Sequence, residues 1–152
     1  MGCFWVLEAG EGIEGMIYRR LRALNRTAPV CFDRERPSLL VVSQEAARRG
    51  VALPDCRTVL LPGEAGELLG ANHAASAVSY GSSPRDTLTL SSREGTRLWA
   101  ALQRELVTVE GRVVEPQEFP LALENGAPSM SALAAAGALL LLGVPPEQIS
   151  QA

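Results

Sequence analysis

Residues 4–24 read FWVLEAGEGIEGMIYRRLRAL and predict a strand, a glycine-rich turn and a helix in immediate succession. The apolar run Phe4–Ala9 is typical of a buried strand. Three glycines in G-x-G-x-x-G spacing follow, and from Met16 to Leu24 the apolar residues recur at helical spacing while the arginines fall on the other face. This segment therefore predicts the first strand-turn-helix unit of a parallel α/β sheet.

Short apolar runs and helix signals continue the same alternation in the first half of the chain. Ser43 is a suitable N-cap for a helix through Arg49, which Gly50 would end. Further strands are predicted at 39–42, 58–61 and 77–80, with another short apolar run at 29–32 and a brief helix at 64–69. Strands that alternate with short helices favour parallel pairing.

The second half of the chain has a different pattern. Polar and apolar residues alternate over 87–91, which is typical of a half-buried strand. Further strands are predicted over 98–109 and 119–123, with Glu110-Gly111 in a hairpin turn. An Ala- and Leu-rich helix follows, which Ser129 or Ser131 would cap and Gly143 would end. A last short helix is predicted from Pro146. We expect one three-layer α/β domain over 1–152, with a parallel half (1–80), antiparallel strands (81–125) and closing helices (126–152).

Composition excludes several classes of function. The chain has 152 residues, 47% of them apolar, and a net charge of −3 without a basic stripe, so nucleic-acid binding is not expected. The most apolar run, 133–144, is shorter than the roughly 20 residues that span a bilayer, and the N-terminus has no signal-peptide pattern. We expect a cytoplasmic protein without a cofactor or membrane partner, whose Cys3, Cys31 and Cys56 are reduced and mostly buried.

The glycine turn suggests a nucleotide site. Gly10, Gly12 and Gly15 would let the backbone approach a pyrophosphate at the start of the helix. Asp33 follows at close to the spacing of about 20 residues expected for a ribose ligand. The Gly81-Ser82-Ser83 turn offers further N–H groups for an anion. The alternative interpretation is structural: the glycines permit a tight turn, and nearby acids complement the helix dipole.

Charge opposes the nucleotide interpretation. The chain contains 14 arginines and no lysine, so it lacks the phosphate-contacting lysine of an ATP-hydrolysing loop. Glu8, Glu11 and Glu14 add negative charge where a phosphate would bind. His73, the only histidine, has no nucleophile elbow to serve, so no catalytic group is assigned.

The order of motifs in the second half resembles the end of a Mur ligase central domain. The resemblance covers about residues 77–150 and is carried by AVSYGSSPRDTLTLSS (77–92) and by SALAAAGALLLLGVPPEQI (131–149). It places the glycine turn of residues 10–15 where that family has its ATP-binding loop. However, Ala127, Pro128 and Ser131 stand where the family has a His and two Asn that contact the nucleotide.

These departures imply a degenerate, truncated relative without ligase chemistry. The leading hypothesis is a non-catalytic domain that acts through protein contacts, including self-association, with Trp99 and Phe119 as possible aromatic anchors. The alternative is a small nucleotide-binding or regulatory module that uses the Gly10–Gly15 loop.

Overall fold

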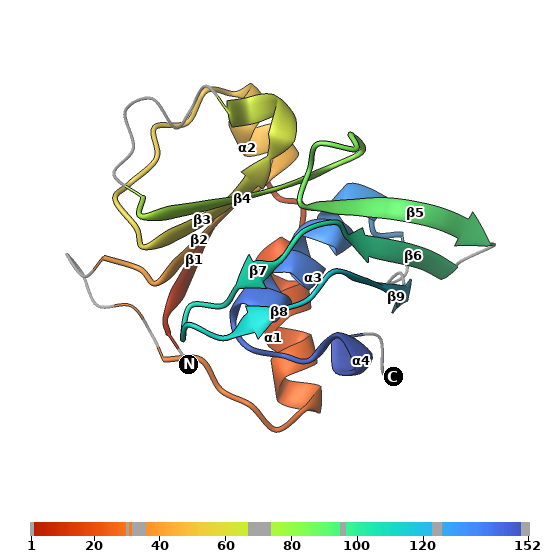
Figure 1. The fold of residues 1–152 in the computed structure, drawn as a ribbon. Helices are drawn as coiled ribbons and strands as arrows, with labels where there is room; N and C mark the ends of the chain where they lie inside the picture. The colour runs from red at the N-terminus through yellow and green to blue at the C-terminus, as the bar shows by residue number, and fades with distance from the viewer. Residues whose placement is uncertain are drawn as a thin grey trace.

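The computed structural model describes residues 2–29, 31, 36–66, 74–94, 97–122 and 126–149, and it confirms the α/β fold (Figure 1). The strands are β1 (Phe4–Leu7), β2 (Leu39–Val42), β3 (Thr58–Pro62), β4 (Ser76–Gly81), β5 (Leu88–Glu94), β6 (Arg97–Leu102), β7 (Leu106–Val107), β8 (Val113–Val114) and β9 (Gln117–Ala122). The helices are α1 (Ile13–Ala23), α2 (Gln44–Arg48), α3 (Ser129–Leu141) and α4 (Pro146–Ile149).

The main sheet has seven strands in the order β1-β2-β3-β4-β5-β6-β9. Neighbours from β1 to β5 are parallel, whereas β5–β6 and β6–β9 are antiparallel. A separate two-stranded antiparallel sheet is formed by β7 and β8. The predicted change from parallel to antiparallel pairing is therefore confirmed.

Helices cover both faces of the parallel strands, which gives three layers. Alternate residues of each strand point to opposite faces, so Leu39 and Val41 join the main core while Leu40 and Val42 join a smaller one. The main core packs under α1 and α3, and the smaller one lies under α2. Figure 1 shows α2 on one side of β1–β4 and the two longer helices on the other. The Ala- and Leu-rich helix is buried along almost its whole length.

The strand direction changes after β5, which still runs parallel to β4 and is reached by a short connection from it. Parallel neighbours normally need a long crossover, but residues 82–87 suffice here because β5 begins beside the last two residues of β4, with Tyr80 opposite Leu88. Asp86, which is 5% exposed, holds this connection by accepting a hydrogen bond from the Ser83 N–H (3.1 Å). Its carboxylate lies against Gly63 and Gly81, where any Cβ would collide with it.

Several predicted boundaries need correction. The predicted strand 98–109 is divided, because Gln103 leaves the sheet and its side chain donates to the carbonyls of Pro84 (3.0 Å) and Asp86 (2.9 Å). Neither Ser129 nor Ser131 caps α3, since Pro128 is its N-cap. The predicted helix 64–69 is a 3₁₀ turn at 63–66 as far as it is described, and the run 29–32 is only partly described, with no strand at Pro29 or Cys31.

The prediction of three reduced cysteines is wrong for two of them. Cys3 and Cys31 form a disulfide, with their Cα atoms 5.2 Å apart, and Cys56 is the free, buried thiol. The bond joins the start of β1 to the segment that follows α1. Because the tertiary fold brings these two segments together, no local cysteine motif predicts the bond. Because disulfides are rare in the cytosol, this bond is a feature that the predicted cytoplasmic location does not explain.

We expect Gly63→Ala to destabilise the protein by about 1–3 kcal/mol, because the new methyl group would displace the Asp86 carboxylate. Gly66→Ala is the matched control, since a Cβ there meets no atom within 4 Å, and it should be neutral or slightly stabilising. The free energy of unfolding from urea titration measures both. Equal effects of the two substitutions, or an undiminished effect of Gly63→Ala in an Asp86→Ala background, would contradict this account.

Candidate functional site

Loops from four parallel strands gather at the carboxyl end of the sheet, which is where ligands bind in open α/β folds. The glycine turn follows β1, Ser43 and Gln44 follow β2, the 3₁₀ turn 63–66 follows β3, and residues 82–87 follow β4. The site is therefore assembled from segments distant in the sequence.

The first two glycines of the turn adopt conformations that favour glycine. Gly10 has φ of 83° and Gly12 has φ of 80°, and Gly12 is the N-cap of α1. Gly15 lies inside the first turn of the helix, and the nearest atoms to a Cβ there belong to the Arg19 side chain. The third glycine therefore does not mediate close packing of the helix against a strand, the role it has in a dinucleotide fingerprint.

The carboxylate of Glu8 occupies the start of α1. Its two oxygens accept hydrogen bonds from the N–H groups of Ile13 (2.8 Å) and Glu14 (3.0 Å). Glu11 bonds back to the Ala9 N–H (3.0 Å). These amides are among those that would face a phosphate at a helix N-terminus, so an internal carboxylate already provides the negative charge that the helix dipole favours.

A shallow pocket of about 200 Å³ lies beside Gly12. It is lined by Glu11, Gly12, Met16, Arg19, Gly126, Ala127 and Pro128. Ala127 and Pro128 are two of the positions where the Mur ligase resemblance has polar nucleotide contacts, and they do lie beside the glycine turn. They contribute no polar side-chain atoms to it.

The other residues predicted for a nucleotide site are dispersed. Asp33 lies outside the described residues, as does His73. The strand that pairs with β1 ends at Val42 and is followed by Ser43, whose buried hydroxyl accepts from the Ala46 N–H (3.0 Å) as the predicted N-cap of α2. Ser82 and Ser83 line a different pocket from Gly12. Nucleotide binding by this set stays a prediction.

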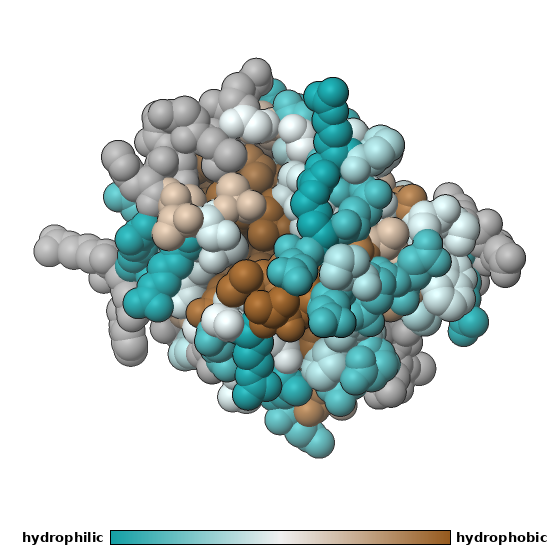
Figure 2. Space-filling model, in the orientation of Figure 1, coloured by the Kyte–Doolittle hydropathy of each residue, from teal (hydrophilic) through white to brown (hydrophobic). Residues whose placement is uncertain are grey.

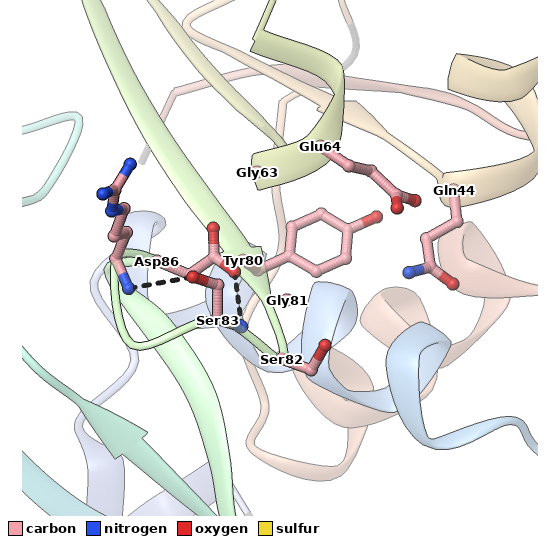
Figure 3. A pocket seen from close by; sticks show the side chains of 9 residues that line it. Gln44, Gly63, Glu64, Tyr80, Gly81, Ser82, Ser83 and Asp86 are labelled. Atoms are coloured by element: carbon pink, nitrogen blue, oxygen red, sulfur yellow. Dashed lines mark hydrogen bonds between the residues drawn. The ribbon is translucent and has the colours of Figure 1, made fainter.

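The second pocket, called here the β2–β4 pocket, has a volume of about 340 Å³. It is lined by Gln44, Gly63, Glu64, Tyr80, Gly81, Ser82, Ser83, Arg85 and Asp86. Figure 3 shows the Tyr80 hydroxyl directed toward Glu64 and Gln44, with the Asp86 carboxylate on the other side of the ring. Most of these residues directly follow predicted strands, so the carboxyl-end rule was the sequence signal that could have identified them.

Tyr80 is the most buried polar group of this pocket, at 1% exposed. Its hydroxyl donates a hydrogen bond to the Val42 carbonyl (2.7 Å), which ties the end of β4 to the end of β2. Burial raises the pKa of the Tyr80 hydroxyl far above its ordinary value, and the carboxylates of Glu11 and Glu64 raise it further. The phenol therefore stays protonated at neutral pH and is not a candidate base.

Comparison with models of known protein families gives no match to this chain, and comparison with curated proteins gives none either. The resemblance to the Mur ligases therefore stays a prediction that rests on the quoted motifs. Within the described ranges, no three His, Cys, Asp or Glu side chains are grouped so as to hold a metal ion. Of the helices in the described part of the chain, none has the length and apolarity to cross a bilayer.

We expect Glu8→Ala to destabilise the protein by about 1 kcal/mol, because two N–H groups at the start of α1 lose their acceptor. Glu14→Ala removes a neighbouring carboxylate, and its smaller effect should be about 0.3–1 kcal/mol from the helix dipole alone. Chemical denaturation of both variants tests this difference. The capping role is refuted if Glu14→Ala costs as much as Glu8→Ala.

Proposed function

We propose that this chain is a non-catalytic domain that acts through protein contacts and associates with a second copy of itself. The contact surface in this proposal is the outer side of the β7–β8 hairpin, called the hairpin face and defined by Val107 and Val113. The observation that carries the proposal is the exposure of these two apolar side chains as a cross-strand pair.

The hairpin has one buried and one exposed side. The pair Leu106 and Val114 packs inward on the main core, whereas Val107 and Val113 pair on the outside and are 51% and 57% exposed. Figure 2 shows apolar surface in the middle of this side of the molecule, where Figure 1 places β7 and β8. Exposed β-branched residues at facing positions are well suited to pack against an identical pair.

Charges around the hairpin support an antiparallel two-fold contact. Glu105 and Glu115 flank the inward pair Leu106–Val114 and make that end of the hairpin acidic. At the turn end, Arg112 and Arg26 line a pocket together with the single acid Glu110. When two hairpins pack antiparallel about a two-fold axis, the acidic end of one faces the basic end of the other. The surface is therefore complementary in charge to a second copy of itself.

The proposed contact is weak. Burying the exposed half of a valine contributes about 1 kcal/mol, so four valines in a two-fold contact contribute about 4 kcal/mol. Loss of translational and rotational freedom costs at least about 4 kcal/mol, so the charged residues must supply the remaining affinity. The expected complex is therefore a concentration-dependent dimer rather than an obligate one.

We expect Val113→Lys to shift the monomer–dimer equilibrium toward monomer, because like charges would meet at the centre of the contact. Ala23→Lys is the matched control, since it adds the same charge at an exposed position of α1 outside the hairpin. Sedimentation equilibrium across a wide concentration range measures both. A wild-type protein that stays monomeric at millimolar concentration, or a Val113→Lys variant that associates like Ala23→Lys, would overturn the proposal.

The alternative function, nucleotide binding at the glycine turn, is favoured by the pocket beside Gly12 and by Arg19 at its edge. A nucleotide phosphate bound there would have to displace the Glu8 carboxylate from the N–H groups of Ile13 and Glu14. We therefore expect ATP, ADP and NAD to leave the melting temperature unchanged, because a ligand raises it only if it binds the native state. A rise in the wild type that Gly12→Arg abolishes would instead establish the alternative.

A further inference from the structure

The β2–β4 pocket lies apart from the hairpin face and shares no residue with it. We infer that this pocket binds a small organic cation that donates N–H hydrogen bonds, such as a primary amine. The inference rests on the hydrogen-bonding capacity left in the pocket, on its charge and on the rigidity of its walls.

Two polar groups of the pocket, the Tyr80 hydroxyl and the Glu64 carboxylate, can act toward a ligand only as acceptors, while Gln44, Ser82, Ser83 and Arg85 also line it and carry groups that can donate. The only proton of the Tyr80 hydroxyl is donated to the Val42 carbonyl, so toward a ligand its oxygen can only accept. The Glu64 carboxylate, toward which this hydroxyl points, is also an acceptor (Figure 3). A ligand that satisfies both groups must be a hydrogen-bond donor.

The charge of the pocket specifies the sign of the ligand. Glu64 and Asp86 line it, against the single cation Arg85. The Glu11 carboxylate is close enough to contribute to the raised pKa of Tyr80. Glu64 also contacts Arg48 at 3.7 Å, but both side chains are about 60% exposed, and exposed pairs contribute little. An ammonium group would compete for Glu64 against only this weak pair.

The walls of the pocket are held before any ligand arrives. The loop 82–87 is fixed from outside by Gln103, whose amide donates to two of its carbonyls, and from inside by the Asp86 bond to the Ser83 N–H. Thr87 is anchored to the Ser79 hydroxyl (3.2 Å). Binding would therefore cost little ordering of the protein, and the volume of about 340 Å³ suits a small molecule.

The test is calorimetric titration with putrescine at low ionic strength, using the Val113→Lys protein so that self-association does not contribute. Butanediol has a chain of the same length without charge, and tetramethylene-bis(trimethylammonium) has the same chain and both charges without an N–H group. We expect heat from putrescine and none from the other two. Absence of binding by putrescine, or equal binding by the bis-quaternary analogue, would overturn the inference.

Three variants locate the binding. Glu64→Gln should weaken putrescine binding by roughly fivefold, the effect of one carboxylate about 4 Å from a cation in an open site. Glu118→Gln is its control, because it changes net charge equally at an exposed residue of β9, outside the pocket lining. Arg85→Gln should tighten binding by removing a like charge. Equal weakening by both glutamate variants, weaker binding by Arg85→Gln, or binding of inorganic phosphate instead would refute the inference.

Discussion

The position of one buried carboxylate determines how the two halves of this sheet are joined. Asp86 lies against Gly63 and Gly81, at the ends of β3 and β4, where the absence of a Cβ leaves room for it. From there it accepts the Ser83 N–H and holds a connection short enough for β5 to start beside the end of β4. This turn fixes the position at which β5 begins, and β5 is the strand on which the antiparallel half of the sheet is built.

A second carboxylate, that of Glu8, supplies the acceptors at the start of α1. A helix N-terminus has unpaired N–H groups that need acceptors, and in nucleotide-binding folds a phosphate supplies them. Here Glu8 supplies them from the end of β1. The glycines remain necessary, because the chain must turn through two positive φ angles before α1 can begin. The spacing of the glycines therefore predicts the path of the backbone. The group that accepts hydrogen bonds from the helix N-terminus depends on the neighbouring side chains.

This distinction also explains how much could be predicted from the sequence. Local signals succeeded: Ser43 caps α2, Gly143 follows the end of α3, and Gly111 with φ of 88° makes the predicted hairpin turn. Each of these depends on a residue's own conformational preference. The Cys3–Cys31 disulfide and the place of Asp86 depend on segments that meet only after folding. Phe119 shows the same limit, since its pattern did not reveal that it lies in the core at 3% exposed.

The composition of the carboxyl edge reverses the chemistry usual for this place in a parallel sheet. Phosphate sites present N–H donors and cations. Here the N–H groups of Ile13 and Glu14 donate to Glu8, and the Tyr80 hydroxyl donates to the Val42 carbonyl. The lining of the β2–β4 pocket contains two carboxylates, Glu64 and Asp86, against one cation, Arg85, together with the neutral side chains of Gln44, Ser82 and Ser83. The Coulomb energy changes sign with the charge of the ligand, so the same carboxylates that would attract the proposed amine would disfavour a polyanion. The chain contains no lysine, so no lysine ammonium group can offset the negative charge of these carboxylates.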